Sequence, residues 1–130
     1  MKMMIRLAMI SILMMLAAPA FAGAVVTVYN CQQSDDADED AVLDTASAWL
    51  EDAKKIKGGE NLEIRVMFPV AAVMDDNDFM FVVIAPSFTE WGTFMDNYEG
   101  ASEAKDSKTY AHIVQCDDSA MWESFKAEDD

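Results

Sequence analysis

The stretch FMFVVIAPSFTEWGTFMDNYEG, residues Phe79 to Gly100, decides how this chain folds. Its first seven residues are all apolar and rich in aromatic and β-branched side chains, which indicates a strand. Successive side chains of a strand point to opposite faces of the sheet. One face would carry Phe79, Phe81, Val83 and Ala85, and the other would carry Met80, Val82 and Ile84. Both faces of this strand therefore need an apolar cover.

A helix is predicted directly after this strand. Ser87 and Glu90 form the S-x-x-E capping pattern, in which each side chain bonds a free backbone N–H of the first helical turn. Apolar residues then recur at helical spacing on one face, and we expect them to belong to the ordinary core, namely Trp91, Phe94, Met95 and Tyr98. Gly100 ends or weakens the helix, so the whole stretch reads as a strand, a short break and a capped helix.

Three further elements are predicted before Phe79. Residues 24–30, AVVTVYN, favour a strand. Residues 32–59 favour an amphipathic helix, because apolar side chains recur every three or four positions, acids gather at its start and lysines gather before a Gly-Gly stop. Residues 62–68 alternate as a half-buried strand, and Pro69 indicates a sheet edge or a bulge. The polar residues 75–78 then form a hairpin turn.

Two elements are predicted after the capped helix. Residues 109–116, TYAHIVQC, favour a fourth strand, and residues 117–130 favour a short C-terminal helix with Met121, Trp122 and Phe125 facing inward. The order strand, helix, strand, strand, helix, strand predicts a ferredoxin-like βαββαβ sandwich of the α+β class. Right-handed crossovers place both main helices on one face of a four-stranded antiparallel sheet.

The other face of this predicted sheet is open, and it carries Met80, Val82 and Ile84. Soluble monomers rarely leave several hundred Å² of contiguous apolar surface in water. Either the C-terminal helix covers this face through Trp122 and Phe125, or a second copy of the chain covers it. The sequence leaves both alternatives open.

The strand order and the stretch VVIAPSFTEWGTFMDNYEG, residues 82–100, resemble the dimeric α+β barrel superfamily, across about residues 24–125. That superfamily includes small antibiotic-biosynthesis-type monooxygenases and related binding proteins. The resemblance implies a homodimer whose two sheets pack face to face, with a small apolar ligand between them. It also implies an alternative function, that of a small cofactor-independent monooxygenase-like enzyme.

The first 22 residues have the three parts of a secretory signal peptide. Lys2 and Arg6 give the positive start, residues 7–18 form an apolar run, and Ala20-Phe21-Ala22 fits the cleavage pattern. We expect cleavage after Ala22 and a periplasmic or secreted protein. Residues 23–130 should then form one domain.

The charge balance bears on the choice of partner. The chain has nine basic and 24 acidic residues, and losing two basic residues with the signal changes the net charge from −15 to −17. Such a surface repels phosphate backbones and anionic lipids, so we expect neither nucleic acid nor a membrane as a partner.

Cys31 and Cys116 are the only two cysteines. Export into an oxidising compartment favours a disulfide between them. The predicted topology opposes it, because both cysteines would lie at the carboxyl ends of antiparallel neighbouring strands, roughly 20 Å apart, beyond the ~7 Å Cα limit for a bridge. A bridge, an intermolecular bond and free thiols all stay open.

Candidate chemistry is sparse elsewhere. His112 and Tyr110 lie on one face of the predicted fourth strand, where they would be the catalytic pair of an enzyme or, for His112, a contact of the open face. A lone histidine is more often a packing residue, and with Cys116 it makes only two ligands, too few for a closed metal site. The acidic run 35–40 lacks the glycine and glutamate of a calcium loop and fits a helix start better. We expect no cofactor and no metal.

The sequence therefore favours an exported, dimeric binding or interaction protein that buries an apolar sheet face against a second copy or around a small apolar ligand. An enzyme is the less favoured alternative.

Overall fold

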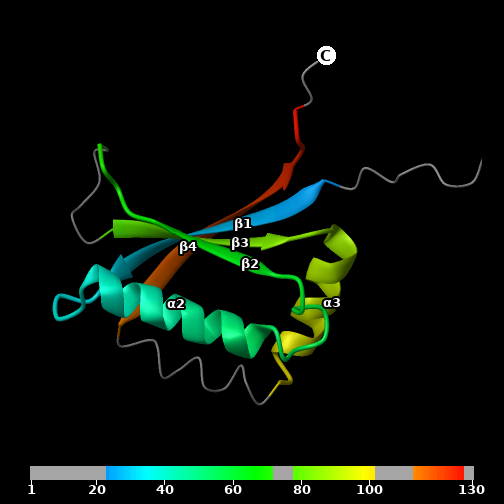
Figure 1. Ribbon diagram of the computed structural model, residues 1–130, viewed down its shortest axis with the longest axis horizontal. Coiled ribbons are helices and arrows are strands. Elements are labelled where there is room, and N and C mark those ends of the chain that lie inside the picture. Colours follow the sequence, from blue (N-terminus) through cyan, green and yellow to red (C-terminus); the bar gives the residue numbers. More distant parts are fainter. Residues whose placement is uncertain (1–22, 72–77, 102–112, 128–130) are drawn as a thin grey trace, which may run out of the picture.

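The computed structural model describes residues 23–71, 78–101 and 113–127, and it has the predicted ferredoxin-like architecture (Figure 1). Six elements follow one another: β1 (Ala24–Gln33), α2 (Glu39–Ala53), β2 (Glu63–Met67), β3 (Asp78–Ala85), α3 (Phe88–Tyr98) and β4 (Val114–Ser124). The strands form a sheet in the order β2-β3-β1-β4, with every neighbouring pair antiparallel. Both helices cover the same face of this sheet (Figure 1).

β1 lies at the centre of the fold and pairs with β3 on one side and β4 on the other. Its side chains alternate as a two-sided strand requires. Val25, Thr27 and Cys31 are buried toward the helices, whereas Val26 and Val28 on the other side are partly exposed. β2 is an edge strand that ends before Pro69, as the proline predicts.

Both helices begin at the caps that their sequences provide. Asp38 caps α2 by accepting a hydrogen bond from the Ala41 backbone N–H, at 2.9 Å, which supports the interpretation of the acidic run as a helix start. Ser87 caps α3 as predicted, because its Oγ accepts from the Glu90 backbone N–H at 3.2 Å, and its hydroxyl donates to the Glu90 carboxylate at 3.1 Å. α2 ends at Ala53, so the lysines expected in its last turn follow the helix instead.

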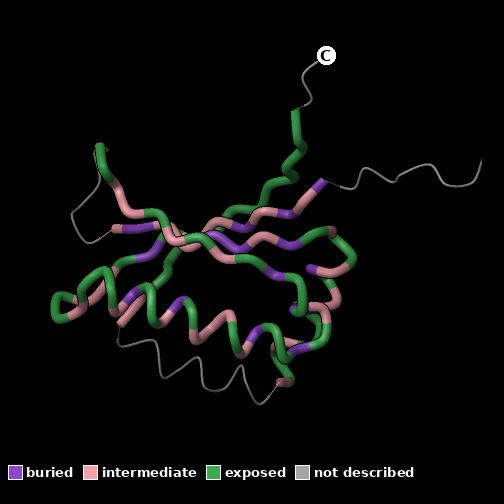
Figure 2. The backbone as a smooth tube through the Cα atoms, viewed as in Figure 1, coloured by how far each residue is buried: buried purple, intermediate pink, exposed green. Residues whose placement is uncertain are grey.

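The core lies between the helices and the sheet (Figure 2). One cluster joins β1, β3, both helices and the α2–β2 connection, and its members are Val25, Ala53, Ile56, Leu62, Val83, Ala85, Trp91 and Phe94. A second, smaller cluster contains Cys31, Val42 and Phe79. Trp91 and Phe94 are buried as predicted, whereas Met95 is 41% exposed, so this methionine is not the core residue that the helical spacing indicated.

The predicted C-terminal helix is wrong. β4 continues through Ser124, so most of the residues assigned to that helix extend the edge of the sheet. They pair with β1 in register, with Trp122 opposite Val26 and Ala120 opposite Val28. The physical reason is the length of β1, whose ten residues would otherwise leave backbone N–H and C=O groups unpaired along this side. Of the fourth strand as predicted, residues 109–112 lie outside the described residues.

Candidate functional site

The open face of the sheet is the site that the sequence singles out. From the strand register its middle carries Val26, Val28, Asn30, Glu63, Arg65, Met67, Met80, Val82, Ile84, Asp118, Ala120 and Trp122, and the strand ends add Ala24, Gln32, Asp78, Gln115 and Ser124. No helix among the described ranges covers it, and Figure 1 shows both helices on the other side. The predicted residues Met80, Val82 and Ile84 are therefore brought together here, on an inner strand.

The most exposed apolar side chains of the open face lie on its edge strands, and Met67 of β2 is 45% exposed. Val82 is only 5% exposed, because neighbouring strands flank it, with Val28 on one side and Arg65 on the other. Trp122 on the edge strand is 62% exposed. Phe125, just past the end of β4, is 66% exposed. The cover predicted from the C-terminal helix is thus absent, and the two aromatic residues expected to supply it are themselves exposed.

Charged residues of the open face lie on its edge strands and at one end of an inner strand. Glu63 and Arg65 are on β2 at one edge, Asp118 is on β4 at the other, and Asp78 is the first residue of β3. Between the edges, the middle of the inner strands carries mainly apolar side chains. An apolar centre with a polar rim is the usual anatomy of a protein interface.

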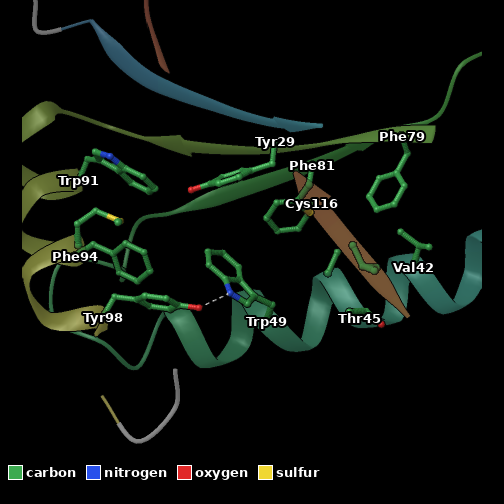
Figure 3. A pocket seen from close by; sticks show the side chains of 13 residues that line it. Tyr29, Val42, Thr45, Trp49, Phe79, Phe81, Trp91, Phe94, Tyr98 and Cys116 are labelled. Carbon is green, nitrogen blue, oxygen red and sulfur yellow. Dashed lines mark hydrogen bonds between the residues drawn. The ribbon is translucent and has the colours of Figure 1, made fainter. Parts of the chain in front are cut away.

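A cavity of about 380 Å³ lies on the opposite side of the sheet, between the sheet and the two helices (Figure 3). Aromatic side chains dominate its wall. The described residues that line it are Tyr29, Val42, Thr45, Ala46, Trp49, Phe79, Phe81, Trp91, Phe94, Met95, Tyr98, Val114 and Cys116. None of these side chains carries a formal charge at neutral pH.

The rings of this cavity hold one another in edge-to-face and tilted contacts. Trp49 of α2 is central, with its ring centroid 5.4 Å from that of Phe81 and 6.1 Å from that of Phe94. Phe94 lies 5.2 Å from Tyr98 in turn. These are the separations that aromatic pairs prefer. Each ring is therefore fixed by its neighbours, which gives the cavity a defined shape.

Two tyrosine hydroxyls are the main polar groups near this aromatic wall. Tyr98 accepts a hydrogen bond from the Trp49 indole Nε1 at 3.2 Å. The Tyr29 hydroxyl forms no hydrogen bond with a described residue, and Figure 3 shows its ring reaching from β1 toward α3. Burial raises the pKa of Tyr29 above its ordinary value, with a further contribution from Tyr98. Tyr29 is therefore neutral at physiological pH and able to donate a hydrogen bond.

Cys31 and Cys116 form a disulfide, which resolves the alternatives left by the sequence. The argument against the bridge assumed that Cys116 ends its strand. Because β4 instead starts at Val114, Cys116 lies near its beginning, directly opposite Cys31 near the end of β1, with a Cα–Cα distance of 3.9 Å. The bridge joins β1 to β4 beside the cavity.

The predicted candidates for catalysis, His112 and Tyr110, lie outside the described residues. The described ranges contain no group of three or more histidine, cysteine or acidic side chains able to hold a metal ion. Nor is any helix within those ranges long and apolar enough to cross a membrane.

No protein-family model matches this chain, and no curated protein matches it with significance. Among solved structures, the chain is similar to a mutant chlorite dismutase from Candidatus Nitrospira defluvii, at 13% sequence identity and a TM-score of 0.41. The match covers 82% of this chain but 42% of that chain, so the region of likeness is less than half of the enzyme. At this level of likeness, the activity in the enzyme's name is not carried over to this chain.

The aromatic cavity is the feature that the sequence did not predict. Its helical residues Trp91, Phe94, Met95 and Tyr98 were interpreted as ordinary core. The sequence signal that could have found it is the density of large rings. Five residues of the predicted strand and helix face line the cavity with Trp49. Four of them are aromatic, namely Phe81, Trp91, Phe94 and Tyr98, and the fifth is Met95.

Proposed function

We propose that this protein is an exported homodimer that buries its open sheet face against the same face of a second copy. The observation that carries this proposal is the exposed apolar edge formed by Trp122 beside the apolar inner strands. In the dimer this edge would become part of a buried interface core, where tryptophan commonly contributes most of the binding energy.

The size of the open face supports a second copy as its occupant. Four strands about 4.8 Å apart, with lengths of 5 to 11 residues at about 3.3 Å per residue, give a footprint of about 500 Å² per copy. Two such faces bury about 1,000 Å² together, the lower bound for a specific interface. Sheets also pack well face to face when both inner faces are apolar.

The charges at the rim support the same occupant. A twofold axis parallel to the strands would place β2 of one copy over β4 of the other, which brings Arg65 level with Ala120 of the partner and one open-face position from Asp118, twice. Arg65 has no ion pair with a residue of the described ranges. This arrangement places each Arg65 near an acid of the other copy, in a mature chain whose expected charge of −17 would otherwise oppose association.

The oligomeric state of the mature protein tests the proposal. Sedimentation velocity and light scattering of residues 23–130 at micromolar concentration should give twice the monomer mass. Salt near 0.15 M should be used, because it screens the general repulsion between two acidic chains. A stable monomer across this concentration range would overturn the dimer.

A pair of matched variants locates the interface. Trp122→Ser should raise the dimer Kd by about 30-fold or more, as expected for an interface tryptophan worth about 2 kcal/mol. Because this side chain is exposed in the monomer, its loss should leave the fold intact. Phe88→Ser removes a comparably exposed ring from α3, on the helix side, and should leave the mass unchanged. Equal effects of both variants would contradict the proposed face.

Charge reversal tests the proposed orientation of the two copies. Arg65→Asp and Asp118→Arg should each weaken the dimer by about 2- to 10-fold, because rim charges contribute modestly. The double reversal should restore the wild-type Kd. If both changes weaken the dimer additively, β2 does not lie over β4 of the partner.

Export is part of the proposal and has its own test. β1 begins at Ala24, two residues after the predicted cleavage site, so removal of the signal would leave the sheet whole. Expression of the full chain in a two-membraned bacterium should give a periplasmic product whose mass starts at Gly23. An uncleaved product in the cytoplasm would contradict export.

A further inference from the structure

We propose that the aromatic cavity between α2, α3 and the sheet is a binding site for a neutral, planar phenolic compound of about two or three fused rings. The cavity lies on the opposite side of the sheet from the open face (Figure 3). The two proposals therefore use different residues and can fail separately.

The size and wall of the cavity point to a flat aromatic ligand. A volume of about 380 Å³ is at the small end of the range found for ligand pockets. The wall is formed mainly by rings whose contacts with one another are edge-to-face or tilted, such as Trp49 with Phe81 at an interplanar angle of 89°. A further planar ring can join such an arrangement in the same geometry, whereas a puckered saturated ring cannot.

The absence of charge in the described wall favours a neutral ligand. An anionic ligand would lose its hydration without gaining a cationic partner, which is costly in an apolar environment. Thr45, the lining hydroxyl on α2, already donates to the Ala41 carbonyl at 2.8 Å. Its oxygen can still accept, whereas the hydroxyls with a proton left to donate are those of Tyr29 and Tyr98.

These two hydroxyls determine the polar group of the ligand. The Tyr29 hydroxyl has no hydrogen-bond partner among the described residues and can both donate and accept. Tyr98 accepts from Trp49, so its own proton remains to be donated. A phenol hydroxyl suits either tyrosine, because it can donate to Tyr29 or accept from Tyr98.

Calorimetry and ligand-observed NMR with four probes at neutral pH test this site. We expect 2-naphthol to bind with a Kd on the order of 0.1 mM. Naphthalene, which lacks the hydroxyl, should bind about 3- to 10-fold more weakly. The saturated analogue 2-decalol and the anion 2-naphthoate should bind more weakly still. No binding of 2-naphthol, or equally tight binding of 2-decalol, would overturn the proposal.

Tyr29→Phe tests the polar contact. This variant should weaken 2-naphthol by about 3- to 10-fold and leave naphthalene unchanged, because only the hydroxyl is lost. Phe88→Leu, which alters an exposed ring outside the cavity, should change neither affinity. An equal loss for both probes in Tyr29→Phe would show that the residue shapes the wall without bonding the ligand.

Filling the cavity tests its location. Ala46 of α2 lines it and is buried, so Ala46→Leu should abolish binding of both aromatic probes while the unfolding temperature stays the same or rises. Unchanged binding would place the probes elsewhere, for example on the open face. A large fall in the unfolding temperature of the Ala46→Leu variant, together with no binding of either probe to the wild type, would show that protein side chains already fill the space.

Discussion

The indole Nε1 of Trp49 donates a hydrogen bond to the Tyr98 hydroxyl at 3.2 Å, and this bond ties the middle of α2 to the last residue of α3. The same pair of rings is in contact, with centroids 6.2 Å apart, and Trp49 also contacts the ring of Phe94 on α3. The bond is therefore a polar contact between the two helices inside an aromatic cluster.

Tyr98→Phe should lower the free energy of unfolding by about 1 kcal/mol, because it keeps the ring but leaves the part-buried indole N–H without its acceptor. Urea unfolding monitored by circular dichroism gives the value. Trp49→Phe combined with Tyr98→Phe completes a double-mutant cycle, and the coupling energy should be close to the effect of the single hydroxyl. A coupling near zero would mean that water replaces the bond at no cost.

Removing the disulfide should lower the free energy of unfolding by about 4 kcal/mol, because the bridge closes a loop with a sequence separation of 85. The matched variant is Cys31→Ala with Cys116→Ala, compared with the oxidised wild type in urea. Mass spectrometry after alkylation, with and without reductant, checks that the wild type starts bridged. Alkylation of the unreduced protein would contradict the disulfide.

Two glycines should respond to alanine in opposite directions. A Cβ on Gly59 would clash with the Ala53 carbonyl oxygen at the end of α2, so Gly59→Ala should destabilise the fold by about 2–4 kcal/mol. A Cβ on Gly92 would meet nothing within 4 Å, and this residue is inside α3, so Gly92→Ala should stabilise by about 0.5–1 kcal/mol. Thermal unfolding of both variants provides the comparison, and shifts in the same direction would contradict it.

The raised pKa of Tyr29 predicts how stability depends on pH. Desolvation by burial, with a smaller contribution from Tyr98, raises this pKa above the ordinary value of 10.0. The folded state therefore keeps the Tyr29 proton at pH values where the unfolded state has lost it. Its contribution to stability is fully present below about pH 10 and decreases as the pH rises through the folded-state pKa.

Tyr29→Phe removes that titration. Its free energy of unfolding should fall less steeply than that of the wild type above about pH 10, while the two curves run parallel at lower pH. Urea unfolding at a series of pH values measures both slopes. Parallel curves throughout the alkaline range would show that Tyr29 titrates alike in both states.

The sequence predicted the elements whose signals are local. The Ser87 cap and the apolar run of β3 are encoded within a few residues, and both are confirmed. The end of β4 is not encoded in this way, because Trp122 and Phe125 fit a helix face as well as a strand. β1, which is far away in the sequence, decides between helix and strand. It is long enough that its backbone N–H and C=O groups need a partner strand along residues 114–124.

The same non-local effect accounts for the candidate sites. Whether Cys116 can reach Cys31 depends on where β4 starts, which β1 sets through the pairing register. Of the open face, Met80, Val82 and Ile84 could be predicted from alternation along β3, but the residues of β4 could not. The density of large rings marks the place of the cavity, but the identity of Phe94 or Trp49 does not reveal whether neighbouring rings fill the space between two layers.

The central place of β1 has a consequence for the order in which this protein can fold. β1 is the first strand of the sheet, yet neither of its partners is its neighbour in sequence, and the second, β4, is the last strand of the chain. If the chain is exported as proposed, its central strand would cross the membrane first, without a partner until β3 had followed and without its second partner until β4 had followed. The disulfide that fastens β1 to β4 would form as one of the final covalent steps, and an enzyme or chaperone that shields a bare apolar strand would act on β1 before any other part of the sheet exists.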